Sequence, residues 1–272
     1  MTERRSIGID RRIDLEWLDA VGGLVAAGAD EPTIRDTVFR LLEGVVVGGN
    51  KRGTACHKTV SVLSRTWVNV PPETRALRDR GAKLLPKLNA PERIGVHWAL
   101  LMATYPFFGD VATNTGRLLA LQGNLTLAQL TRRTREQWGD RSTMTRAVQR
   151  IIRSMVQWGA LADGDERGVY VAGKKTIAMP AKVGELLLEA LLMRHDGESV
   201  PVDQALRHPG FFPFRLELRA HQLRRSDRFD IHRQGLDVDV VTLVRGGDGA
   251  GAPPKAMLSG PREPTPRGGS RR

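Results

Sequence analysis

The chain has 272 residues, enough to bury one large hydrophobic core or two smaller ones, and its single cysteine, Cys56, excludes a disulfide framework and a cysteine-based zinc site. No run of about eighteen apolar residues is present and the first residues are charged, so the sequence predicts neither a membrane span nor a secretory signal and favours the reducing cytoplasm. The formal net charge of +12 predicts a polyanionic partner, although an arginine-rich composition alone also produces such an excess.

A basic arm at residues 1–12 is followed by a predicted helical lobe at residues 13–108. Apolar residues recur in the lobe at three- and four-residue spacing, which is the period of an amphipathic helix. Pro32 suits the first position of the second helix. The expected helices cover residues 13–27, 32–43, 55–67, 73–88 and 92–104.

Two features of the lobe suggest functional sites without matching their requirements. The glycine-rich stretch GVVVGGNKRGT at residues 44–54 lacks the Gly-Lys-Ser/Thr order that a phosphate-binding loop needs, so a turn between helices is expected. His97 lies inside a very apolar helix. We expect it to pack in the core, because the sequence offers no partners for a catalytic histidine.

Residues 109–175 carry the most informative order of elements. Thr126 is expected to cap a helix that Gly139 ends, and Ser142 is expected to cap the next helix. The whole order is a helix at 110–122, a short extended link, a helix at 127–138, a tight turn, a helix, a short strand at 160–162, a polar tip and the strand VYVA. This order predicts a winged helix-turn-helix.

The third helix of this module has two contrasting faces. Its apolar stripe, predicted to pack on the other two helices, consists of Met144, Val148, Ile151, Ile152 and Met155. Three arginines fall on the opposite face, which in such a module enters the major groove. The predicted DNA-binding residues are Arg132, Arg133, Arg135, Arg141, Thr143, Thr145, Arg146, Arg150, Arg153, Arg167, Lys174 and Lys175.

Members of this set are expected to contact different parts of the DNA. Arg141, Thr143, Thr145 and Arg146 lie at the start of the helix, where base edges are usually read. The arginines further along the helix, and those of the preceding helix, are expected on phosphates. Arg167, Lys174 and Lys175 are the useful cations near the hairpin, but the neighbouring acidic residues Asp163, Asp165 and Glu166 would repel phosphate.

The remainder of the chain is predicted to be a small α+β region at residues 176–245 and a disordered basic tail at residues 246–272. The α+β region should contain a helix at 181–194 with a leucine stripe. The loop HPGFFPF should bury its three phenylalanines, and a terminal hairpin should turn near Gly235.

Four stretches carry a resemblance to a known family: AAGADEPTIRDTV after an opening helix, the Trp-ending helix LSRTW, the apolar RIGVHWALLMATYPFFGD, and the run that ends in SMVQWGAL. In order and character they resemble BrxA, the small DNA-binding protein of BREX phage-defence systems, over about residues 10–162. The resemblance implies a helical lobe joined to a winged helix, DNA binding and no catalysis. Residues 175–272 have no counterpart in it, so a different role on the same scaffold stays open.

The leading hypothesis is a mainly α, non-enzymatic protein that binds double-stranded DNA without cofactor or metal, with other defence-system proteins as further partners. A metal-dependent nuclease is an alternative: Glu217, Asp237 and Asp239, with His232 nearby, could hold a metal ion, although solvent-facing strand positions explain them as well. A second alternative is an assembly adaptor that uses the winged helix for contacts with other proteins. The scarcity of surface aromatics disfavours single-stranded RNA.

Overall fold

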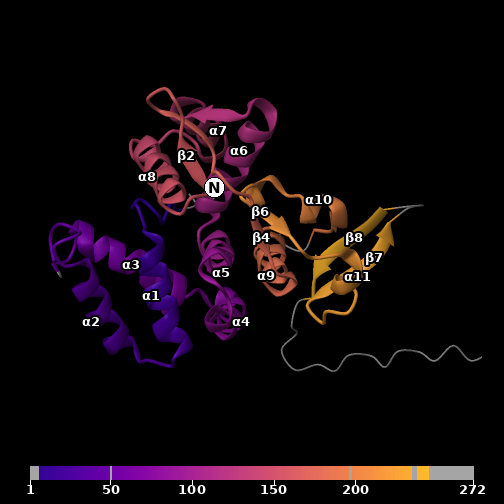
Figure 1. Ribbon diagram of the computed structural model, residues 1–272, viewed down its shortest axis with the longest axis horizontal. Coiled ribbons are helices and arrows are strands. Elements are labelled where there is room, and N and C mark those ends of the chain that lie inside the picture. Colours follow the sequence, from indigo (N-terminus) through magenta and orange to yellow (C-terminus); the bar gives the residue numbers. More distant parts are fainter. Residues whose placement is uncertain (1–5, 50, 196–197, 235–237, 245–272) are drawn as a thin grey trace, which may run out of the picture.

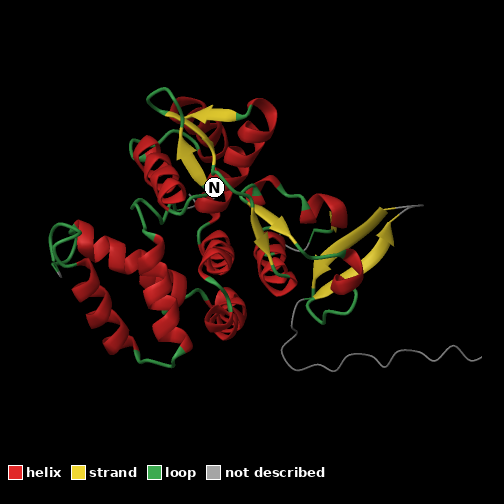
Figure 2. Cartoon of the chain, viewed as in Figure 1, coloured by secondary structure: helices red, strands yellow, loops and turns green. Residues whose placement is uncertain are grey.

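The computed structural model describes residues 6–49, 51–195, 198–234 and 238–244. The fold is mainly helical, with a smaller part that contains strands toward the C-terminal end (Figure 2). Residues 1–5 of the predicted basic arm and the predicted tail at 246–272 lie outside the described residues. No helix in the described part of the chain is long and apolar enough to cross a membrane.

Five helices form the N-terminal lobe at the positions that apolar periodicity predicts. The caps explain two of the starts: the Asp30 side chain accepts from Thr33 N, and Asn89 forms a capping box with Glu92. Pro32 therefore occupies the second helical position and not the first. The bounds are α1 Leu15–Ala26, α2 Glu31–Leu42, α3 Ala55–Trp67, α4 Arg75–Leu84, with short 3-10 turns at Pro72–Thr74 and Leu85–Lys87, and α5 Ala90–Thr104.

The central module combines three helices with a small antiparallel sheet. Its strands lie in the order β1-β3-β2, so the strand before the second helix pairs with the last strand of the hairpin. The register places Leu125 opposite Tyr170 and Leu161 opposite Ala172. The bounds are α6 Pro106–Gln122, β1 Asn124–Thr126, α7 Leu127–Trp138, α8 Met144–Gln157, β2 Leu161–Asp163 and β3 Val169–Ala172.

Local chemistry sets most of these boundaries. Thr126 forms the predicted cap, as a capping box with Gln129, and Gly139 ends α7 with a φ of 72°. The prediction that Ser142 caps α8 is wrong. The chain between α7 and α8 continues one residue further as a turn, so Thr143 is the cap residue, and its side chain makes no capping hydrogen bond.

The first helix of the module is longer than predicted. α6 begins at Pro106 and not at 110, because proline is tolerated in the first turn of a helix, and Phe107, Phe108 and Gly109 then fall on its buried surface. The module boundary predicted at residue 109 lies inside this helix.

The C-terminal region confirms the predicted helix and hairpin. Strands β4 and β6 pair in parallel, and β5, β8 and β7 form an antiparallel sheet in that order. The predicted turn near Gly235 lies outside the described residues. The bounds are β4 Ile177–Met179, α9 Ala181–Leu192, β5 Val200–Pro201, α10 Val202–Leu206, a 3-10 turn at Pro209–Phe211, β6 Phe214–Leu216, α11 Ala220–Leu223, β7 Phe229–Gln234 and β8 Val238–Leu243.

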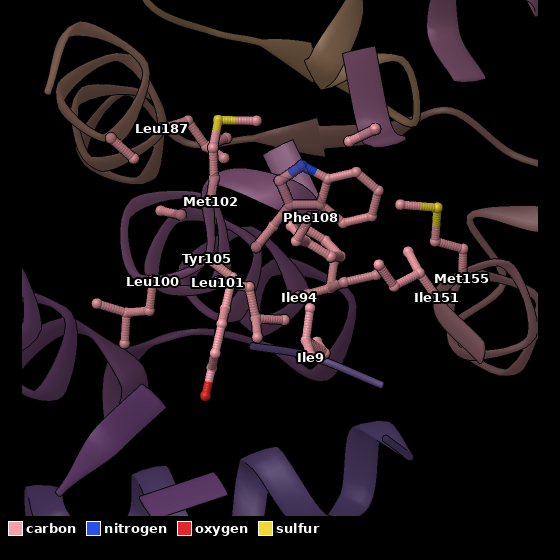
Figure 3. Packing of buried hydrophobic residues seen from close by; sticks show 14 of the residues in the cluster. Ile9, Ile94, Leu100, Leu101, Met102, Tyr105, Phe108, Ile151, Met155 and Leu187 are labelled. Atoms are coloured by element: carbon pink, nitrogen blue, oxygen red, sulfur yellow. The ribbon is translucent and has the colours of Figure 1, made fainter. Parts of the chain in front are cut away.

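Helix α5 lies between the three parts of the molecule (Figure 1). Every residue from Ile94 to Met102 is buried, which explains why this helix has no polar face. Trp98 is its centre: the rings of Phe108, Trp158, Phe212 and Phe214 lie 5.2 to 5.9 Å from its ring. Figure 3 shows side chains of α5, α8 and α9 meeting in this one core, so the lobe, the central module and the C-terminal region share it.

The N-terminal segment, residues 6–14, fastens the lobe to α8. Ile9 and Ile13 are buried, and Ile13 N donates to Ser154 Oγ at 2.8 Å. Leu15 N donates to Gln157 Oε1 at 2.8 Å, and Trp158 Nε1 donates to the Ile13 carbonyl at 2.9 Å. Ile9 of the predicted basic arm is therefore part of the core, and the residues that follow the arm, Ile13 and Leu15, attach it to the C-terminal end of α8.

Candidate nucleic-acid interface

Helix α8 separates a buried face from a charged one. All five members of the predicted apolar stripe are fully buried, as is Ala147 beside them. Thr145, Arg146, Gln149 and Arg150 are exposed. At 3.6 residues per turn, the solvent-facing positions from Thr145 to Arg150 span an arc of roughly 140°. This arc is wide enough for a helix to enter a groove while the other side remains in the core.

Arg135 and Arg153, both in the predicted DNA-binding set, form ion pairs within the protein at its surface. Arg153 Nη1 lies 2.6 Å from Asp163 Oδ1, which joins α8 to β2. Arg135 lies 3.3 Å from Asp140 Oδ1 and donates to Thr145 Oγ1 at 3.2 Å, so it bridges the turn between α7 and α8. These guanidinium groups brace the module, and a phosphate would have to compete with their present partners.

Four other arginines of the set have no such engagement. Arg132, Arg146 and Arg150 are exposed and Arg133 is half-buried, and none of them has an acceptor or ion-pair partner among the described residues. Arg141 lies over the ring of Trp138, 5.9 Å from its centroid, so its guanidinium lies at the end of α7. A cluster of cations therefore lies along α7 and α8.

The start of α8 is open to an anion as well. The first turn of α8 has no acidic residue, and the exposed Thr143 makes no side-chain cap. The first backbone N–H groups of a helix lack intrahelical partners and carry the positive end of the helix dipole. Phosphate oxygens are well suited to such a position.

Residues outside the predicted set hold the α7–α8 turn in place. Trp138 Nε1 donates to Asp110 Oδ2 at 2.9 Å, and the other carboxylate oxygen of Asp110 pairs with Arg194 at the end of α9. Asn114 Nδ2 donates to Gln137 Oε1 at 3.0 Å. No sequence pattern indicated this support, because Asp110 and Arg194 are 84 positions apart.

The β2–β3 hairpin presents charges of both signs. Asp163, Asp165, Glu166 and Arg167 are all exposed around its tip, and Gly164 N donates to the Val169 carbonyl to close it. The two lysines that follow β3, Lys174 and Lys175, are also exposed. The acidic tip weakens the hairpin as a phosphate-binding element, as its sequence predicts.

Glu217 and Asp239, two of the carboxylates that the alternative metal hypothesis names, lie beside arginines. Asp239 forms an ion pair with Arg224, and Glu217 lies 3.9 Å from Arg215. Within the described ranges no group of three or more His, Cys, Asp and Glu residues converges in a way that suits a metal ion. Asp237 lies outside the described residues, so its position is not part of this comparison.

Comparisons with known proteins return no relatives for this chain. No protein-family model matches it, and neither a curated protein nor a solved structure shows a significant match. The assignment of a function therefore depends on the geometry and the charges described above.

Proposed function

We propose that this chain is a non-enzymatic protein that binds double-stranded DNA, and that residues 106–175 act as a winged helix-turn-helix with α8 as the recognition helix. The order α6-β1-α7-α8-β2-β3 and the strand order β1-β3-β2 support this reading. Only residues 139–143 separate α7 from α8, which is close to the three- or four-residue turn of a helix-turn-helix.

One observation carries the proposal: the unpaired arginines on the exposed face of α8. Arg146 and Arg150 are one helical turn apart, and like charges at this spacing destabilise a helix by about 0.2–0.5 kcal/mol. Neither has an acidic partner among the described residues that would offset this repulsion. A duplex supplies that partner, because its phosphates form a continuous negative surface.

The proposed contacts follow from position along α8. Thr143, Thr145 and Arg146 lie at its start and would read base edges, whereas Arg150, Arg132 and Arg133 would bind phosphates. Arg135 and Arg153 would position the helix through Asp140 and Asp163. This division differs from the expectation for Arg135 and Arg153, which was phosphate binding for both.

Fluorescence anisotropy with a labelled duplex tests the proposal. Arg146→Ala and Arg150→Ala should each weaken binding, with a loss of about 1–3 kcal/mol for Arg146→Ala if that side chain contacts a base. Both variants should keep the wild-type melting temperature, because the side chains are exposed and alanine favours helix. Ile151→Ala is the control for packing and should lower the free energy of unfolding by about 2–5 kcal/mol.

Duplex binding by the two arginine variants decides between DNA and another partner. If both arginine variants bind duplexes as tightly as wild type, α8 serves another partner, and the adaptor hypothesis takes precedence. A pull-down of nuclease-treated extract with wild type and with Arg146→Ala would then identify whether a protein occupies the same face.

We also propose, on the resemblance over about residues 10–162 alone, that this DNA binding serves cytoplasmic phage defence alongside other proteins of such a system. Phage plating on cells that carry the complete system with wild type or with the doubly substituted Arg146→Ala/Arg150→Ala chain is the test. We expect protection with wild type and its loss with the double variant, and equal plating on both strains would contradict a role for this face in defence.

A further inference from the structure

The N-terminal segment, the loop before α3 and α8 line an open hollow of about 380 Å³. Its walls include Arg11 and Arg12 from the segment, Val47 from the loop, Ala55 from the start of α3, and Arg150 from α8. In Figure 1 the segment passes between α3 and α8 at this place. The Arg11–Arg150 hollow therefore brings together cations from elements that are far apart in sequence.

The hollow has more positive charge than its own carboxylates balance. Arg12 is satisfied by a bidentate ion pair with Asp14, with distances of 2.7 and 2.8 Å. Arg150 has no partner in the described part of the chain. Arg11 has only the Asp10 carbonyl, 3.1 Å from Nη1, and the Asp10 carboxylate at 3.7 Å.

Arg11 also carries an unsatisfied buried donor. Its side chain is 19% exposed, and its Nε–H is buried without an acceptor among the described residues. A buried donor without a partner is costly, and native structures leave few of them. Arg11 also lines the hollow, and its guanidinium keeps donors that the Asp10 contacts leave unused.

The surroundings favour an anion. Ala55 is the first residue of α3, a helix of 13 residues, so the positive end of its dipole lies at the wall. The valines of the loop and Trp17 form apolar walls that lower the local dielectric and strengthen the field of the arginines. Guanidinium groups suit phosphate because their fork of donors matches two of its oxygens.

We propose that the Arg11–Arg150 hollow receives a backbone phosphate of the duplex that α8 reads. This inference rests on the proposed DNA binding, and it extends it, since the helical lobe then contacts nucleic acid together with the central module. Arg150 faces both the duplex and the hollow, so it links the groove contact to the lobe. The N-terminal segment fixes the distance between them through the hydrogen bonds from Ile13 and Leu15 to α8.

Substitutions outside α8 test the hollow separately from the recognition helix. Arg11→Gln should weaken duplex binding about three- to tenfold near 100 mM salt and reduce the slope of log affinity against log salt by about one, the value expected for one phosphate contact. Arg75→Gln is the matched control. It removes the same charge from an exposed position on α4 that does not line the hollow, and should change neither quantity.

A second pair of variants avoids any effect on folding. Val47 is 86% exposed and lines the hollow, so Val47→Asp adds a negative charge at its wall without opening the core. Val47→Asp should weaken duplex binding, whereas the neutral Val47→Asn should bind as wild type. Equal binding by these two variants, or wild-type binding by a folded Arg11→Gln, would overturn the proposal.

The remaining outcomes separate the hollow from the function of α8. If Arg146→Ala weakens duplex binding and the substitutions in the hollow do not, DNA binding stands and the hollow plays no part in it. If the wild type binds no duplex at low salt, the proposed function fails. The proposal that a DNA duplex supplies the phosphate in the hollow then fails with it. Melting curves in inorganic phosphate and in chloride at equal ionic strength then show whether a free phosphate binds: a rise of roughly 2–4 °C that Arg11→Gln abolishes would identify that source.

Discussion

His97 has two hydrogen-bond partners that its apolar surroundings in the sequence did not indicate. Its Nε2 lies 2.8 Å from Asp19 Oδ1, and its Nδ1 accepts from Trp67 Nε1 at 3.2 Å. Because the indole N–H can only donate, Nδ1 must be the unprotonated nitrogen and Nε2 must carry the proton. His97 is therefore a neutral, fully buried side chain that joins α1, α3 and α5.

The expectation that His97 packs in the core is confirmed, and the partners that the sequence did not indicate are Asp19 and Trp67. Asp19 lies 78 positions away in sequence and on another helix, so neither spacing nor periodicity could pair the two residues. The pair lacks an adjacent nucleophile among its hydrogen-bond partners in the described residues, and its evident role is to satisfy polar groups in the core.

This histidine predicts a pH dependence of stability. Burial lowers the pKa of His97, and this effect outweighs the hydrogen bond to Asp19, which raises the pKa. The histidine therefore binds a proton less readily in the folded state than in the unfolded state. The free energy of unfolding should be at its full value above the ordinary pKa of about 6.5 and should fall as the pH decreases below it. Urea unfolding at pH 7.5, 6.5 and 5.5 measures this.

His97→Gln is the variant that isolates the effect, because glutamine keeps a donor and an acceptor but does not titrate. The dependence on pH should become shallower in this variant. It should not vanish, since burial also lowers the pKa of His208 to about 4. An unchanged slope in His97→Gln would assign the dependence to other groups.

At the scale of elements, helix α6 packs closely on the turn at Pro209–Phe211 because a glycine lies at the point of contact. Gly116 lies in the middle of α6, where the turn at Pro209–Phe211 crosses it. A Cβ at Gly116 would lie 1.9 Å from the Pro209 carbonyl oxygen. Backbone cannot move away as a flexible side chain can, so α6 and this turn approach each other only because residue 116 is glycine.

Two glycines in helices should therefore respond in opposite directions to the same substitution. Gly116→Ala should lower the free energy of unfolding by about 1–3 kcal/mol, because the methyl group overpacks the contact. Gly23→Ala in α1 should raise it by about 0.5–1 kcal/mol, because nothing lies within 4 Å of the added carbon and alanine is the better helix former. Urea unfolding of both variants is the measurement, and stabilisation by Gly116→Ala would contradict the close approach of α6 and the turn.

At the scale of the whole molecule, Glu189 joins the lobe to the C-terminal region. It lies on α9 with a side chain only 4% exposed, accepts from Arg228 Nη2 at 2.6 Å just before β7, and pairs with Arg80 on α4. A buried carboxylate is stable only with such partners. This group is one reason why the lobe and the C-terminal region behave as parts of one core.

Removal of this carboxylate should destabilise the whole fold. Glu189→Ala should lower the free energy of unfolding by about 3 kcal/mol; this is the lower end for breaking a buried pair, because both arginines are about one-third exposed. Glu185→Ala, on the same helix, removes an ion pair with the exposed Lys182 and should cost less than about 1 kcal/mol. Equal losses in the two variants would show that solvent screens the Glu189 contacts.

The sequence by itself determined most of the elements and the two faces of α8. Periodicity placed α3 at residues 55–67 and the stripe from Met144 to Met155, because a helix repeats its buried side at a fixed spacing whatever it packs against. Cap chemistry placed Thr126 and Gly139, since those interactions are local. The sequence placed the start of α6 at residue 110 and the cap of α8 at Ser142, whereas the structure has them at Pro106 and Thr143.

Only the tertiary structure decided which charges are free. In sequence, Arg146, Arg150 and Arg153 form one equivalent row, yet Asp163 pairs with Arg153 while Arg150 lines the same hollow as Arg11. The same holds for Asp19 with His97 and for Glu189 with Arg228. Ion pairs and hydrogen bonds between distant segments depend on how helices cross, and a linear pattern carries no record of that crossing.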